Sequence, residues 1–196
     1  MKSTLLKLAL FFSIVMGAQT AVPPADWQIK TAVLSVPEEF RDAAKVYGYD
    51  ANGDFVTLRE GANQYICIAD NPKKDGFEVA SYHKDLDVFM ARGRELKAQG
   101  KGFKEIFDMR EEEVKSGRLF MPDKSTLAVF MGTVNKDSKE IENQRIRYVV
   151  YIPFATAEST GLPASPKAAG HPWIMNPGTH RAHIMITPAN PNMKKK

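Results

Sequence analysis

The spacing of apolar positions changes along the chain, and each spacing predicts an element. Residues 27–34 form a mostly apolar segment that predicts a first strand. Ser35-Val-Pro-Glu38 then has the pattern of a capping box with proline near the start of a helix. Apolar residues recur at helical spacing over 40–47, and Gly48 is suited to end that helix. The amino-terminal part is therefore predicted to be a strand followed by a helix.

The rest of the chain changes between strand and helix patterns. Helical spacing is found over 86–96 and 103–114, and a glycine follows each segment. Short apolar segments bounded by turn residues predict strands at 55–60, 64–69, 77–82, 127–131, 146–153, 172–175 and 182–186. This order predicts an α+β fold with a mostly antiparallel sheet and about three helices packed on it. We assign residues 22–192 to a single domain, a length that supports one core.

The last two predicted strands form a hairpin around Asn176-Pro-Gly-Thr179, where proline and glycine occupy the positions of a type II turn. This tight turn pairs Met175 with His180, which places His171 about 13 Å from His180 on the same sheet face. His183 lies three residues after His180, so it is expected on the opposite face.

The first 21 residues have the order of a secretory signal peptide. Lys2 and Lys7 flank a short charged start, an apolar run spans 8–18, and small or polar residues follow up to Ala21. The run is about half as long as the ~20 apolar residues that a membrane-spanning helix needs. The alternative is a buried amino-terminal helix. The signal peptide predicts an exported protein, periplasmic or extracellular, that is not stably inserted in a membrane after processing.

The formal net charge of +4 is due to lysines at the two ends of the chain. Lys2 and Lys7 belong to the signal peptide, and residues 193–196 form a basic tail with three more lysines. Without these five charges the folded part has a net charge of −1. A nucleic-acid-binding surface keeps its positive charge within the fold, so no nucleic-acid partner is expected.

Three isolated features favour structural roles over chemistry. Cys67 is the only cysteine, and its apolar neighbours favour a small buried side chain over a reactive thiol. Residues 50–54, Asp-Ala-Asn-Gly-Asp, begin like a calcium loop but lack its later glycine and glutamate, whereas Asn52-Gly53 favours a hairpin turn. Arg92 and Arg94 do not share a helical face, which favours surface arginines over a site for an anionic ligand.

Three of the four histidines, His171, His180 and His183, are close together near the carboxyl end, and His83 ends an earlier strand. Imidazoles are common ligands of zinc and similar metals. A divalent metal held by His180 and His183 with an acid from elsewhere is possible if a bulge or loop replaces the predicted strand. The tight hairpin instead favours ordinary hydrogen-bonded histidines, and both interpretations stay open.

A second candidate site follows the most apolar predicted strand. Glu158 is suited to act as a general base or ligand, and Ser159 and Thr160 to form hydrogen bonds, at a position where binding residues are common. The alternative is a capped turn, because serine and threonine before a glycine also satisfy backbone groups. The sequence contains no G-x-S-x-G elbow, P-loop, dinucleotide fingerprint or haem motif.

Three segments are distinctive: YVVYIPFATAESTG at 148–161, HPWIMNPG at 171–178 and AHIM at 182–185. These segments, together with 82–86 and 89–96, resemble uncharacterised secreted bacterial proteins. The resemblance covers most of the chain after residue 21. It implies a bacterial envelope context and carries no activity.

Together these observations predict an exported, soluble envelope or secreted protein that binds a small molecule or envelope partner through its carboxyl-terminal loop and hairpin. The predicted binding residues are Glu158, Ser159, Thr160, His171, Trp173 and His180. One alternative is a hydrolase-type enzyme, metal-dependent in one version, that uses Glu158 and two of the carboxyl-terminal histidines His171, His180 and His183. Another is a purely structural envelope component. The enzyme requires Glu158 and two histidines in one pocket, whereas a binding module requires an apolar pocket.

Overall fold

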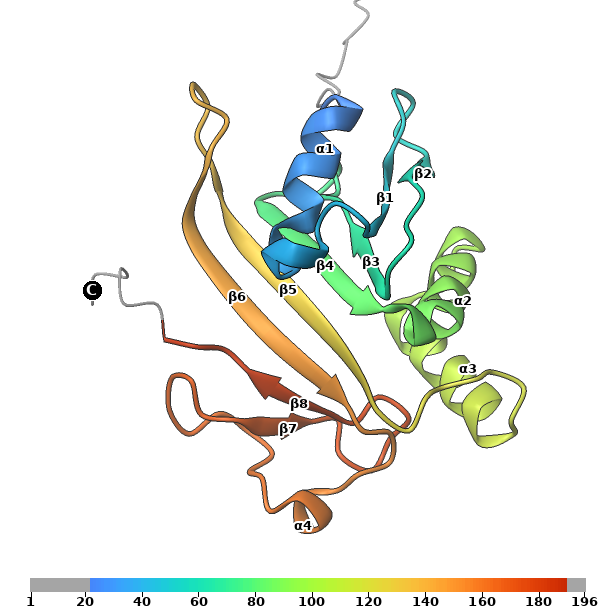
Figure 1. The fold of residues 1–196 in the computed structure, drawn as a ribbon. Coiled ribbons are helices and arrows are strands. Elements are labelled where there is room, and N and C mark those ends of the chain that lie inside the picture. Colours follow the sequence, from blue (N-terminus) through green and yellow to red (C-terminus); the bar gives the residue numbers. More distant parts are fainter. Residues whose placement is uncertain (1–21, 190–196) are drawn as a thin grey trace, which may run out of the picture.

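The computed structural model describes residues 22–189, within which eight strands form one sheet of order β2-β1-β3-β4-β5-β6-β8-β7 (Figure 1). Neighbouring strands are antiparallel except β1 and β3, which are parallel. The predicted α+β class with a mostly antiparallel sheet is confirmed. The predicted signal peptide and basic tail lie outside the described residues. The strands are β1 (Lys45–Tyr49), β2 (Phe55–Arg59), β3 (Tyr65–Ile68), β4 (Phe77–His83), β5 (Ser125–Val134), β6 (Ile141–Tyr151), β7 (Trp173–Met175) and β8 (His183–Ile186).

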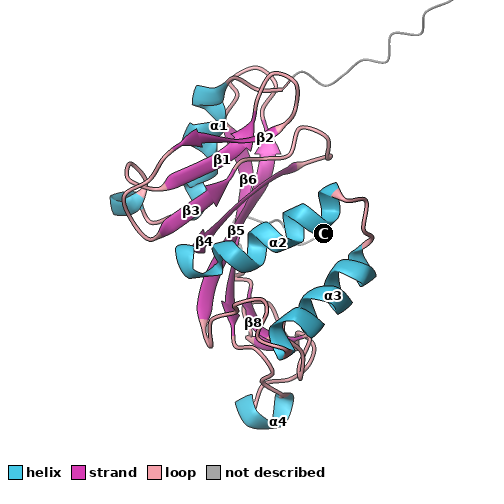
Figure 2. Ribbon diagram, turned by 90° about the vertical axis from the view of Figure 1, so that its right-hand side faces the viewer, coloured by secondary structure: helices cyan, strands magenta, loops and turns pink. Residues whose placement is uncertain are grey.

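Helices cover both faces of this sheet. Helix α1 (Ala25–Ala32) packs on one face, here called the back face, and α2 (Asp87–Ala98) and α3 (Phe103–Lys115) pack on the other, the front face (Figures 1 and 2). Side chains of the strands contribute to two cores, one on each face of the sheet, because successive side chains point to opposite faces. Cys67 lies in the back core and its neighbour Ile66 in the front core. A short helix α4 (Ala157–Thr160) lies at the far end of the molecule from α1.

The predicted strand over 27–34 is wrong, because most of this segment is helix α1. Its buried positions Gln28, Thr31 and Ala32 have helical spacing. Gln28 explains the misleading pattern, because it is polar yet only 2% exposed. Its side chain donates a hydrogen bond to the Tyr49 carbonyl (2.8 Å) and accepts one from the Tyr49 N–H (2.9 Å). A polar residue thus anchors the helix to β1.

The predicted helix over 40–47 is also wrong. Only Glu38–Phe40 form a single 3₁₀ turn after Pro37, and β1 begins at Lys45. Strand β1 pairs with β2 on one side and β3 on the other, so long-range pairing overrides the helical spacing of the segment. Glycine at position 48 lets the Gln28 side chain of α1 pack closely on β1. A Cβ at this position would lie 2.6 Å from the side-chain oxygen of Gln28.

The predicted register of the carboxyl-terminal hairpin is wrong as well. Met175 pairs with His183, not His180, and the connection comprises residues 176–182. Backbone hydrogen bonds tie this connection to the segment after β6: Phe154 N–H donates to Thr179 O (2.7 Å), and Gly178 N–H to Ala155 O (2.8 Å). His180 therefore lies in the connection, and the shift by three residues brings His183 to the front face.

Candidate functional site

The turn at residues 50–54 is a hairpin turn, as the Asn-Gly pair predicted. One Asp50 carboxylate oxygen accepts the N–H groups of Asn52 (2.9 Å) and Asp54 (3.0 Å). Gly53 has φ +80°, a conformation that favours glycine. The Asp50 side chain therefore stabilises the turn between β1 and β2.

The buried location predicted for Cys67 is confirmed. Its side chain is fully buried in the back core, and this burial raises the pKa of the thiol to about 12. Within the described residues it is a free cysteine. A thiol with such a pKa is uncharged and unreactive at neutral pH.

The predicted loop residues Glu158, Ser159 and Thr160 form helix α4. Glu158 and Ser159 are exposed, and Ser159 forms a reciprocal capping box with Thr156. The pKa of Glu158 is lowered, chiefly by a backbone N–H, as expected at a helix start. In the part of the chain that the structure describes, Glu158 forms no ion pair with a histidine.

The other predicted residues separate into exposed and buried groups. His171 is exposed, and Trp173 is half-buried against the front core. His180 and His183 are buried, at 0% and 4% exposure. The structure therefore brings His180 and His183 to the same side of the sheet and leaves His171 at the surface.

His180 lies between α3 and the edge of the front core. Its Nδ1 is 3.3 Å from a Glu111 carboxylate oxygen, and its ring packs edge-on against Phe107 (4.8 Å between centroids) and Phe89 (5.6 Å). Two arginines pack on the same aromatic rings, Arg110 over Phe89 and Arg181 over Phe107. We call these residues the His180 cluster: Phe89, Phe107, Arg110, Glu111, His180 and Arg181.

His183 lies beside this cluster. Its ring is 5.3 Å from that of Tyr151, and its Nδ1 donates to the carbonyl of Arg181 (2.6 Å). Burial lowers the pKa of His183, and burial also lowers the pKa of His180, to about 4. Across residues 22–189, no three side chains of His, Cys, Asp or Glu are grouped so that they could hold a metal ion. The two histidines thus act as neutral, packed side chains.

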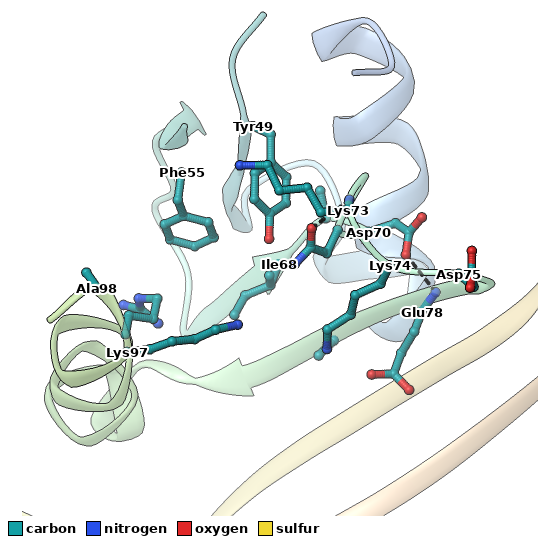
Figure 3. Close-up of a pocket in the computed structure, with 14 residues that line it drawn as sticks. Tyr49, Phe55, Ile68, Asp70, Lys73, Lys74, Asp75, Glu78, Lys97 and Ala98 are labelled. Carbon is teal, nitrogen blue, oxygen red and sulfur yellow. Dashed lines mark hydrogen bonds between the residues drawn. The ribbon is translucent and has the colours of Figure 1, made fainter. Parts of the chain in front are cut away.

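A larger hollow lies elsewhere on the front face, between the β1–β4 part of the sheet and the end of α2 (Figure 3). We call this cavity of about 700 Å³ the cleft. Ile68 and Ala80 line it from strands β3 and β4. The rings of Tyr49 and Phe55 form an aromatic wall. The remaining lining residues are Ala69, Asp70, Asn71, Lys73, Lys74, Asp75, Glu78, Arg94, Lys97 and Ala98.

Arg94 is a fixed part of the cleft wall. It donates hydrogen bonds to Tyr82 and to Asp87, both at 3.2 Å. Its guanidinium carbon lies 5.2 Å from the Tyr47 ring centre and 5.3 Å from that of Phe55. These contacts orient Arg94, which is half-buried and not the surface arginine that the sequence predicted. Arg92 instead makes a bidentate ion pair with Glu113 that joins α2 to α3.

Two lysines of the cleft are differently placed. Lys97 on α2 and Lys74 on the β3–β4 connection extend into the cleft from opposite sides (Figure 3). Among the described residues, neither ammonium group has an ion pair or hydrogen bond. Asp70, which also lines the cleft, accepts a hydrogen bond from the Glu78 N–H (3.0 Å) through one carboxylate oxygen. Burial raises the pKa of the Asp70 carboxyl. The sequence marked residues 71–76 only as a turn, because no local pattern shows that they face α2.

A smaller cavity of about 260 Å³ is lined by His83, Asp85 and Ser125 with three other residues. His83 Nδ1 accepts the Asp85 N–H (3.3 Å) and lies 3.3 Å from an Asp85 carboxylate oxygen, whereas the histidine of a hydrolase triad donates from Nδ1 to its carboxylate. In addition, Ser125 pairs with Tyr151, a front-core residue, whereas His83 follows the front-core residue Tyr82. The Ser125 hydroxyl and the His83 ring therefore point to opposite faces.

Comparison with models of protein families, with curated proteins and with solved structures gives no match for this chain. Within residues 22–189, none of the helices has the length and apolar character needed to cross a membrane.

Proposed function

We propose that this chain is an exported protein that binds a small molecule with a flat apolar body and an anionic group in the cleft. The observation that carries the proposal is the pair of lysines, Lys74 and Lys97. Both extend into the cleft and form no ion pair or hydrogen bond among the described residues, although the charge of Lys74 acts on Asp70. The volume of the cleft falls in the range of about 300–1,000 Å³ typical of small-molecule sites.

The walls of the cleft suggest how such a ligand lies. A flat body would contact Tyr49, Phe55 and Ile68, which offer apolar surface on the front face. Its anionic group would lie between Lys74 and Lys97, where two ammonium donors converge. Lys97, Ile68 and Phe55 lie on a helix and on strands, which hold binding groups more rigidly than a loop does, whereas Lys74 lies on the β3–β4 connection.

The carboxyl-terminal residues support binding less well. Glu158, Ser159 and His171 are exposed, and the hydroxyl of Ser159 is used in the cap of α4. The enzyme alternative required Glu158 and two histidines in one pocket, and the described residues do not provide that convergence. We therefore place the site in the cleft, on the opposite part of the front face from α4.

Two fluorescent probes test the proposal. 8-Anilinonaphthalene-1-sulfonate has a flat body and a negative charge, and N-phenyl-1-naphthylamine has the same body without the charge. Replacing Lys97 with alanine should weaken the anionic probe about fivefold, the effect of losing about 1 kcal/mol of exposed charge interaction. Binding of the neutral probe should change by less than twofold.

Lys30→Ala is the matched control, because Lys30 is an exposed helical lysine on the back face. It should leave both affinities unchanged. Equal affinity of the anionic probe for the wild-type and Lys97→Ala proteins would overturn the proposed site.

Export is tested separately. Amino-terminal sequencing of protein recovered from the periplasm or medium should give a start between Ala18 and Pro23. An intact Met1 on protein from the cytoplasm would contradict export and would leave the cleft proposal unaffected.

A further inference from the structure

The His180 cluster contains three buried nitrogen atoms without a hydrogen-bond partner in the described part of the chain: Nε of Arg110, Nε2 of His180 and Nε of Arg181. His180 contacts the rings of both Phe89 and Phe107, and each arginine lies over one of these two rings. The Arg110 guanidinium carbon lies 4.2 Å from the centre of Phe89, and that of Arg181 lies 5.9 Å from the centre of Phe107. Buried polar atoms are nearly always paired, so three unpaired nitrogens in one cluster indicate a partner from outside the chain.

Within residues 22–189, neither Arg110 nor Arg181 lies within ion-pair distance of a carboxylate. The charge of Glu113 acts on Arg110 only from a greater distance. The adjacent carboxylates of α3 are already engaged, Glu111 with Lys115 and Glu113 with Arg92. Burial, together with the nearby charge of Arg181, lowers the pKa of Arg110 to about 10. The cluster therefore holds excess positive charge in a place with little water.

Helix α2 has a glycine, Gly93, at the position where it packs against Arg110. Gly93 lies in the interior of α2, where glycine is a poor helix former. A Cβ at Gly93 would lie 2.8 Å from Nη1 of Arg110. Nη1 also donates to the carbonyl of Phe89 (3.2 Å), so the guanidinium is held against α2. The position of this buried charge is thus specified by two helices.

The hydrogen-bonding roles in the cluster determine what fits there. Glu111 is ionised at neutral pH, because hydrogen bonds from Lys115 and His180 lower its pKa. The Nδ1 of His180 therefore carries the hydrogen and donates to Glu111, which leaves Nε2 as an acceptor. A group that satisfies all three nitrogens must accept from Arg110 and Arg181 and donate to His180.

We propose that the His180 cluster is a binding site for a protonated oxyanion of the hydrogen phosphate class. Such an ion brings the missing negative charge, oxygen atoms that accept from both guanidinium groups, and a hydroxyl that donates to His180. Sulfate and carboxylates lack that hydroxyl hydrogen at neutral pH, and water lacks the charge. Arg181 is half-buried and lies over the ring of Phe103, which is 77% exposed, so this side of the cluster is the nearest to solvent.

Thermal unfolding in the presence of inorganic phosphate tests the site, with sulfate at equal ionic strength as the comparison. Phosphate should raise the Tm of the wild-type protein in a saturable way, by about 3–6 °C at ten times its Kd. Sulfate should give less than half of that shift. Arg181→Gln should abolish the phosphate effect and still fold, because Arg181 is not part of the core.

Arg118→Gln is the matched control, since Arg118 is an exposed arginine just after α3. It should keep the full response to phosphate, and so should Lys97→Ala in the cleft. An equal response to phosphate and sulfate would overturn the preference for a protonated ion. The absence of any saturable shift, or a shift that Arg181→Gln retains, would overturn the site and leave an ordered water as the partner of these nitrogens.

Discussion

The cleft and the His180 cluster both present positive charge on the front face, but they hold it in opposite ways. In the cleft, Lys74 and Lys97 extend from exposed positions and remain solvated. In the cluster, Arg110 is 8% exposed and His180 is completely buried. Charges that stay in water contribute little to stability, whereas buried groups depend strongly on their neighbours.

This difference separates binding from folding. Lysines with long flexible side chains adapt to a ligand and cost little when they are removed. Arginines stacked on aromatic rings are fixed before a ligand arrives, so their donors are preorganised. We therefore expect cleft substitutions to change affinity and cluster substitutions to change the free energy of unfolding as well.

The largest effect is expected from Phe89→Ala. Phe89 is 1% exposed, and Tyr151, His180 and Arg110 all contact its ring. Its truncation should reduce the free energy of unfolding by about 3–5 kcal/mol, measured by urea denaturation. Phe120→Ala is the control, because Phe120 is 59% exposed and should change stability by less than about 0.5 kcal/mol. Similar losses of stability for Phe89→Ala and Phe120→Ala would show that the buried cluster is not a special contributor to the free energy of unfolding.

Acidification should weaken the cluster next. The pKa of His180 falls from an ordinary value of 6.5 to about 4, mainly through burial, so the folded protein favours the neutral ring. Its contribution is fully present above pH 6.5 and is lost as the pH falls towards 4. Between pH 7 and pH 5 the wild-type protein should lose about 2 kcal/mol through this group.

His180→Gln separates this loss from the titration of carboxylates, because the variant should lose about 2 kcal/mol less than the wild type over the same interval. His171→Gln, at an exposed histidine, should behave like the wild type. Parallel pH profiles for wild type and His180→Gln would show that His180 is not held neutral by the fold.

Gly93→Ala should have a smaller effect, and it should destabilise the protein. Alanine in a helix interior normally stabilises by about 1 kcal/mol. Here its Cβ would meet Nη1 of Arg110 at 2.8 Å, so we expect a net loss of about 1 kcal/mol. In the Arg110→Met background the same change should become stabilising, and a double-mutant cycle measures the coupling. Stabilisation by Gly93→Ala alone would place Arg110 elsewhere.

The smallest effect on stability is expected in the cleft. Lys74→Ala and Lys97→Ala should each change the free energy of unfolding by less than about 0.5 kcal/mol. Urea denaturation without ligand gives this value. A loss above 1 kcal/mol would mean that these lysines support the fold, which would blur their contrast with the cluster.

The sequence predicted the elements that are defined by local spacing. Helices α2 and α3 and the β2, β3 and β4 strands lie where periodicity placed them. The prediction failed between residues 27 and 47, where Gln28 is buried by bonding to β1 and where parallel pairing with β3 turns a helix-like segment into a strand. Such pairing involves partners distant in sequence, which local spacing does not contain.

The candidate sites show the same limit. The histidines near the carboxyl end attracted attention through their number, and two of them proved to be buried. Their proximity depends on the actual hairpin register, which hydrogen bonds to residues 154 and 155 determine. The partners of His180 come from α2 and α3, and the cleft combines the β3–β4 connection with the end of α2. No motif in the sequence marks residues so far apart as neighbours.

We expect two separate cationic sites on the front face to take different anions. Backbone amide NMR of the chain from residue 22 onward, titrated first with 8-anilinonaphthalene-1-sulfonate and then with inorganic phosphate, distinguishes the two sites residue by residue. The sulfonate should shift signals of residues 68–74 and 94–98, and phosphate should shift those of Arg110, His180 and Arg181. Overlapping sets of shifted signals, or phosphate shifts confined to the cleft, would contradict the account.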